Sequence, residues 1–117
     1  MVEIKLQVPE KLAARLAPIG PWIPTVLELS VIGFKTSAAR TAAEIIDFLS
    51  DSPTPAQVLD YHVSDRAQER LRRLLVLNRG EALGADEEAE LDELQKIEHV
   101  VVMLKAQACA TTDERPE

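Results

Sequence analysis

Aromatic side chains are scarce in this chain, which has 117 residues but only one Trp, one Tyr and two Phe. Proteins that stack bases against their surface rely on exposed aromatic rings, so the composition offers little for that kind of binding. Apolar residues still make up 46% of the chain, which is enough for a hydrophobic core. We therefore expect an aliphatic core of Leu, Val, Ile and Ala, side chains that suit the packing of helix against helix.

Cysteine is almost absent as well. Cys109 is the only one, which excludes an intramolecular disulfide and a metal site with several thiolate ligands. The chain also lacks a Gly-rich phosphate loop and a Ser–His–Asp set at a workable spacing. His62 and His99 each stand without a second ligand at a suitable spacing, so we expect neither to bind a metal. The sequence predicts no cofactor, no metal site and no enzymatic activity.

Long apolar runs are missing too. No stretch approaches the length needed to cross a membrane, and Met1 leads directly into a segment of alternating polarity that does not resemble a signal peptide. From this pattern we expect a soluble cytoplasmic protein without a membrane partner.

Positive charge is in short supply, and the imbalance lies in the second half. Residues 1–50 hold five Lys/Arg and five Asp/Glu, whereas residues 51–117 hold eight and fifteen, and the net charge is −7. An acidic half repels nucleic-acid phosphates and suits a basic protein partner. An ordinary solvated surface that aids solubility explains the same charge and is the simpler interpretation.

Polarity alternates strictly over residues 2–8, a pattern typical of a half-buried β-strand. A lone strand leaves its backbone groups unpaired, and no second strand follows. We therefore expect this strand to pair with the same strand of a second copy, as a ribbon across a homodimer, or with the sheet edge of another protein. The apolar face, predicted to lie in the dimer interface, consists of Val2, Ile4, Leu6 and Val8.

A rigid turn, PIGPWIP, separates a first short helix from a second one, and Trp22 is predicted to plug the space beneath the turn. The second helix, from Thr25 to about Ile32, is apolar nearly all round. Such a helix is expected to be buried, and we place Leu27 and Val31 in the same dimer interface.

Four parts follow from these patterns. We predict a strand–helix–helix dimerisation part over residues 1–50, a Pro-containing linker over 51–63, an acidic helical hairpin over 64–110 and a frayed tail over 111–117. The fold class is mainly α, with a short N-terminal β-strand followed by helices and a C-terminal antiparallel helical hairpin.

The hairpin has the clearest helical periodicity in the chain. Ser64 is a suitable N-cap for its first helix, and Gly80 is predicted to end that helix. Acidic residues load the start of the second helix, where the helix dipole favours negative charge. Apolar residues then recur in steps of three and four, and we predict that this stripe binds a partner. Its members are Leu91, Leu94, Ile97, Val101 and Leu104.

The N-terminal sequence VEIKLQVPEKLAARL, followed by a turn and TVLELSVI, resembles the start of a ribbon–helix–helix protein. In that family a strand pairs across a dimer and its outward side chains enter the DNA major groove. The resemblance implies that Lys5 and Gln7 face DNA, since both residue types bind base edges. The Pro-rich turn departs from the short turn of the family.

The stretch SPTPAQVLDYHVSDRAQERLRRLLVLNRGEALGADEEAELDELQKIEHVVVMLKAQA resembles a widespread group of small bacterial proteins regarded as antitoxins and frequent in cyanobacteria. This resemblance implies an antitoxin of a two-gene pair. Its N-terminal part would dimerise and bind its own operator, and its acidic hairpin would cover a basic, nuclease-like toxin.

Two other classes of function remain open from the residues alone. The chain is also compatible with a non-catalytic helical scaffold that self-associates into a homodimer or higher homo-oligomer. An accessory subunit that adds helices to a larger complex is the third interpretation.

Overall fold

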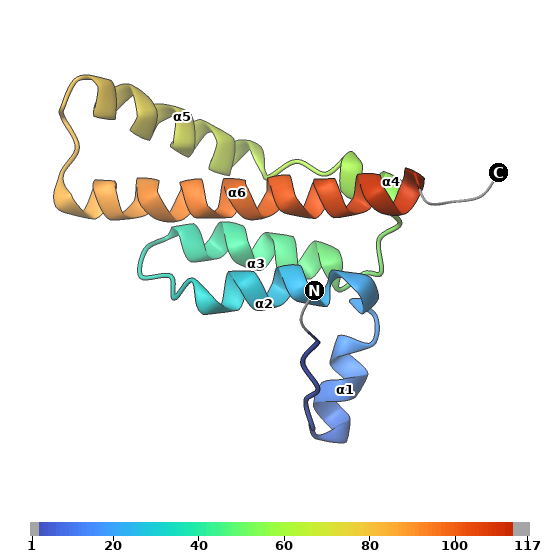
Figure 1. Ribbon diagram of the computed structural model, residues 1–117. Coiled ribbons are helices and arrows are strands. Elements are labelled where there is room, and N and C mark those ends of the chain that lie inside the picture. The colour runs from blue at the N-terminus through green and yellow to red at the C-terminus, as the bar shows by residue number, and fades with distance from the viewer. Residues whose placement is uncertain (1–2, 114–117) are drawn as a thin grey trace.

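The computed structural model describes residues 3–113, in which helices account for the regular secondary structure (Figure 1). The elements are α1 (Glu10–Leu16), a 3₁₀ turn η1 (Gly20–Trp22), α2 (Ile23–Val31), α3 (Ala38–Leu49), α4 (Pro55–Leu59), α5 (Asp65–Arg79) and α6 (Ala85–Asp113).

The predicted N-terminal strand and its ribbon are wrong, because residues 3–9 form no strand and the described part of the chain contains none at all. An alternating pattern produces a strand only where a neighbouring strand satisfies its backbone groups, and the described elements are all helical. Ile4 and Leu6 are 78% and 69% exposed, so the apolar face of this segment is not buried by the chain itself. The fold is helical without a β-element in residues 3–113.

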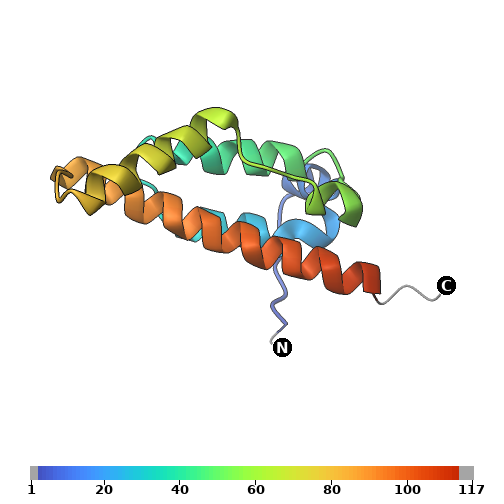
Figure 2. The ribbon, with the colours of Figure 1, turned by 90° about the horizontal axis from the view of Figure 1, so that it is seen from above.

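Helix α6 is the centre of the bundle. It packs against α2, α3, α4 and α5. Figure 1 shows α5 on one side of α6 and α2 and α3 on the other, and in Figure 2 α6 runs along the front of the bundle. Its 29 residues bring apolar side chains to one stripe at steps of three and four, and that stripe is buried. The buried apolar side chains of α6 are Leu91, Leu94, Ile97, Val100, Leu104 and Ala108.

A single hydrophobic core extends from Ile19 to Ala108. It includes Val58 of α4, which is fully buried although it lies in the stretch predicted as a linker. Thr54 and Gln57 form a capping box at the start of α4, so this short helix is fixed locally as well as by packing. The 51–63 stretch is therefore a packed part of the bundle.

Trp22 confirms its predicted role as a plug beneath the turn. Its side chain is 2% exposed, and its Nε1 donates a hydrogen bond of 3.0 Å to the carbonyl oxygen of Pro53.

The prediction for the helix that follows Trp22 is wrong in two respects. Helix α2 begins at Ile23 instead of Thr25, and it is not buried all round, since Leu27 and Val31 are 50% and 82% exposed.

The hairpin helices α5 and α6 lie where the periodicity predicts them. The Ser64 hydroxyl accepts a hydrogen bond from the backbone N–H of Ala67, and Gly80 follows the last residue of α5. Helix α6 continues to Asp113, so residues 111–113 of the predicted frayed tail are helical, and residues 114–117 lie outside the described part.

Candidate protein-binding grooves

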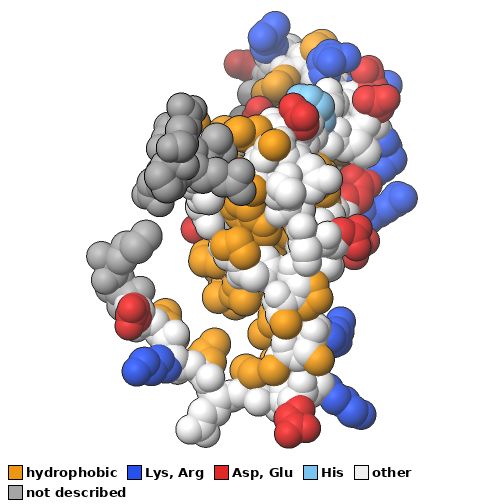
Figure 3. Space-filling view, turned by 90° about the vertical axis from the view of Figure 1, so that its right-hand side faces the viewer, with side chains coloured by type: hydrophobic (Ala, Val, Ile, Leu, Met, Phe, Trp, Pro, Cys, Tyr) orange, Lys and Arg blue, Asp and Glu red, His pale blue; other side chains and the backbone are white. Residues whose placement is uncertain are grey.

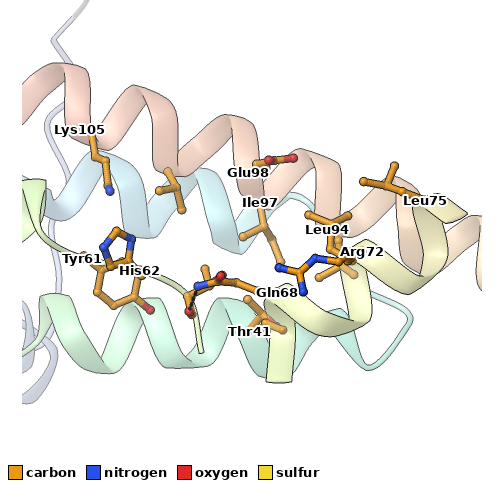
Figure 4. A pocket seen from close by; sticks show the side chains of 14 residues that line it. Thr41, Tyr61, His62, Gln68, Arg72, Leu75, Leu94, Ile97, Glu98 and Lys105 are labelled. Carbon is orange, nitrogen blue, oxygen red and sulfur yellow. Dashed lines mark hydrogen bonds between the residues drawn. The ribbon is translucent and has the colours of Figure 1, made fainter. Parts of the chain in front are cut away.

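An open groove of about 440 Å³ lies between α5 and α6, and we call it the α5–α6 groove (Figure 4). Its floor is apolar and buried, with Leu94 and Ile97 of α6 beside Thr41 of α3. Its walls come from half-buried apolar side chains, Leu75 on α5 and Val101 on α6. A groove of this kind can hold an apolar segment from another molecule.

Polar groups line the two ends of this groove. Lys105, Tyr61 and His62 lie at one end, and Arg72 lies near the other (Figure 4). Tyr61 is held in place by its ring, which stacks on Phe48 with the centroids 4.4 Å apart. Burial, and secondarily the nearby Glu44 carboxylate, raise the pKa of Tyr61 above its ordinary value.

Two buried carboxylates on α6 fix the helices around the groove. Glu90 accepts two hydrogen bonds from Arg70 of α5, from Nε at 2.8 Å and from Nη2 at 2.9 Å. Those bonds lower the pKa of Glu90 below its ordinary value, against the opposing effect of burial. A bidentate pair of this kind sets the position of α5 against α6 with defined geometry.

Glu93 performs the same task for α3. Its carboxylate accepts hydrogen bonds from the backbone N–H of Lys35 at 3.0 Å and from the backbone N–H and hydroxyl of Thr36 at 3.2 and 2.7 Å. Burial works to raise the pKa of Glu93, but the bonds from Thr36 and Lys35 outweigh it and the pKa is lowered. The turn that receives this carboxylate begins at Gly33, whose φ of +70° favours glycine.

The roles of Glu90 and Glu93 in holding α5 and the start of α3 were not predicted from the sequence, where the acidic run was explained by the helix dipole alone. A signal was present in the sequence: Glu90 and Glu93 share the helical phase of the apolar stripe, so they fall on the buried face. In the described part of the chain no group of three or more His, Cys, Asp or Glu side chains is arranged to hold a metal ion.

The predicted partner-binding stripe lies mostly inside the core. Four of its five side chains are buried against the chain's own helices, and in this conformation a partner cannot reach them except where the groove exposes the edges of two. The buried residues are Leu91, Leu94, Ile97 and Leu104. Val101 is half-buried and forms part of the groove wall.

The predicted dimer residues are exposed but are not brought together within one chain. Leu27 and Val31 lie on the outer side of α2, while Ile4, Leu6 and Val8 lie in the N-terminal segment, which stands apart from the bundle (Figure 3). Val2 lies outside the described residues. Lys5 and Gln7 are exposed on the same segment, and without a ribbon nothing orders them for entry into a DNA groove.

A second groove of about 440 Å³ runs between α2 and α6. Val31 at the end of α2 and Ile32 directly after it line one side, His99 and Val100 of α6 line the other, and Glu28 of α2 is also in the lining. Asp92 and Lys96, both on α6, also line this groove and form an ion pair at 3.1 Å.

No family model matches the chain, and neither a curated protein nor a solved structure is similar to it. Among the described residues, no helix combines the length and the apolar character that crossing a membrane requires.

Proposed function

We propose that this chain is an antitoxin-like binding protein of the cytoplasm, which neutralises a basic toxin protein of the nuclease class by holding it in the α5–α6 groove. The observation that carries the proposal is the groove itself, an apolar trough between two long helices with charged residues at its rim. Grooves between helices accept an amphipathic segment, whose apolar face enters the trough.

The acidic surplus of the half of the chain around the groove supports a basic partner, while the groove lining itself carries Glu98 together with Arg72 and Lys105. Residues 51–117, which contain both groove helices, hold fifteen acidic and eight basic residues. Glu98 lines the groove and is exposed, and in the described part of the chain it has no ion-pair partner. Arg72, by contrast, is engaged by Glu69 at 2.9 Å, which removes part of the positive charge from the rim. The resemblance of residues 52–108 to bacterial antitoxins supports the same class of partner.

The experiment uses the protein encoded next to this chain's gene as the probe. Its expression alone in a bacterial host should arrest growth, and co-expression of the chain should relieve the arrest and yield a stoichiometric complex. Leu75→Glu places a charge on the apolar wall and should abolish relief. Glu98→Arg reverses a rim charge and should weaken binding more at low salt than at high salt.

Matched controls are available on the same helices. Val76→Glu makes the same change one residue further along α5, at a side chain that is 60% exposed and outside the groove. Glu88→Arg reverses an exposed acid of α6 that is also outside it. Both controls should relieve growth arrest like the wild type. A neighbour that does not arrest growth, or relief by Leu75→Glu equal to that by Val76→Glu, would contradict the proposal.

A self-associating helical scaffold is the second candidate, and the exposed apolar residues of the N-terminal segment favour it. Autoregulation through DNA is not proposed, because the ribbon on which it depended is absent from the described residues.

A further inference from the structure

Residues 3–15 are exposed along their whole length, and at the end of this segment only the half-buried Leu16 packs against the core. Helix α1 has seven residues and none of them is buried. A helix of that length is unstable in isolation and needs a surface to pack on. The segment before it, residues 3–9, which we call the N-terminal arm, exposes Ile4 and Leu6. Figure 3 shows hydrophobic side chains of the arm and of α1 facing each other across a hollow.

A complementary apolar surface lies on the bundle. Helices α2 and α6 run antiparallel, since Gln107 bonds the Pro21 carbonyl at one end and Glu93 bonds Lys35 at the other. Leu27 lies one turn before Val31 on the outside of α2. On α6, Val102 and Met103 lie about one turn beyond His99, and their side chains are 59% and 52% exposed. We call this surface the α2–α6 face, and it consists of Leu27, Val31, His99, Val102 and Met103.

The N-terminal segment and the rest of the chain differ in net charge. Residues 1–17 hold three basic and two acidic residues, whereas residues 18–117 hold ten basic and eighteen acidic residues. Lys11 and Arg15 of α1 have no ion-pair partner in the part of the chain that the structure describes. Glu28, at the edge of the groove beside the α2–α6 face, is exposed and equally unpaired there.

We infer that a second copy of this chain covers both surfaces: the N-terminal arm and α1 of each copy pack on the α2–α6 face of the other. Side chains make this contact, and it involves no pairing of strands. A two-fold axis makes the two contacts identical and closes the assembly as a dimer. A standard interface uses about 20–30 residues a side, which residues 3–17 together with the outer sides of α2 and α6 can supply. This inference goes beyond the proposed function and leaves the α5–α6 groove free.

The first test is the molar mass of three purified variants, measured by light scattering over a range of concentrations. The face variant Leu27→Lys/Val31→Lys and the arm variant Ile4→Glu/Leu6→Glu change only exposed side chains, so both should fold with unchanged helical content. Each should dissociate at least ~100-fold more readily than the wild type, given the apolar burial lost. The control Val76→Lys changes a comparably exposed apolar side chain on α5, 60% exposed, and should remain a dimer.

The second test mixes the arm variant with the face variant. In an arm-on-face dimer the mixture restores one native contact, and it places the acidic arm opposite the basic face in the other. A heterodimer should therefore form, although neither variant self-associates. A monomeric wild type would overturn the inference. So would dissociation of the Val76→Lys control, or a mixture that stays monomeric, since arm-on-arm or face-on-face contacts would not be restored by mixing.

Discussion

The Glu93 carboxylate is predicted to hold the start of α3 in place, and Glu93→Ala is the perturbation that tests this. The side chain is 8% exposed and accepts bonds from two backbone N–H groups and one hydroxyl. Removing it leaves the N–H groups of Lys35 and Thr36 without an acceptor in a partly buried turn. The Thr36 hydroxyl also accepts a bond from the backbone N–H of Ala38, so the loss disturbs the cap of α3.

The magnitude follows from those donors. A buried donor without a partner costs about 1–3 kcal/mol, and water can reach this partly buried turn, so we take ~1 kcal/mol for each backbone N–H. Loosening of the α3 cap adds about 0.5–1 kcal/mol. The expected loss is about 2–3 kcal/mol of unfolding free energy, which for a chain of this size lowers Tm by roughly 8–12 °C. Glu93→Gln keeps one acceptor oxygen and should lose about half as much.

Chemical and thermal unfolding followed by circular dichroism measure both quantities. Gln95→Ala is the control, since it removes an exposed side chain two residues further along α6 and should change the free energy by less than ~0.5 kcal/mol. If Glu93→Ala were no less stable than Gln95→Ala, the reasoning that this carboxylate satisfies the α3 turn would be refuted.

Three further predictions use the same unfolding assay. Arg70→Ala should lower the free energy of unfolding by about 2 kcal/mol, because it leaves the buried Glu90 carboxylate without its half-exposed arginine partner. Arg70→Lys should recover little of this loss, since lysine cannot form the bidentate pair. Trp22→Phe should lose about 2–3 kcal/mol, since it leaves the Pro53 carbonyl without its donor and opens a small cavity. The folded-state pKa values of Glu90 and Glu93 lie below 4.5, so their contribution should be complete above about pH 5 and lost as the pH falls below 4.5. A pH profile that is as steep in the Arg70→Ala variant as in the wild type would contradict the last prediction.

The buried face of α6 shows what the apolar periodicity of a helix can and cannot predict. Steps of three and four among Leu94, Ile97 and Leu104 specify that one side of the helix is apolar, and that side is indeed buried. The same pattern does not say what covers it. The apolar stripe predicted a partner protein, whereas α2, α3, α4 and α5 cover the stripe within the chain. Only the arrangement of the helices decides between these outcomes, because a partner protein and the chain's own helices can bury an apolar surface equally well.

In the N-terminal arm the local sequence pattern predicted the wrong secondary structure. Its alternation is as regular as that of a true strand, yet strand formation depends on backbone partners that no local pattern supplies. The two buried carboxylates are a similar case, since Glu93 reaches donors at Lys35 and Thr36, far away along the chain.

The sequence by itself indicated a mainly helical chain, although its alternating start also predicted a strand that is absent from residues 3–113. It determined the limits of α5 near Ser64 and Gly80 and the phase of the apolar stripe on α6. Those features depend on capping and on periodicity within a few residues, which are local properties. The tertiary structure decided that α6 is central, that the acids at Glu90 and Glu93 are internal acceptors, and that the apolar side chains of the arm and of Leu27 and Val31 on α2 stay exposed. These depend on contacts between segments distant in sequence, where packing geometry chooses which surfaces meet.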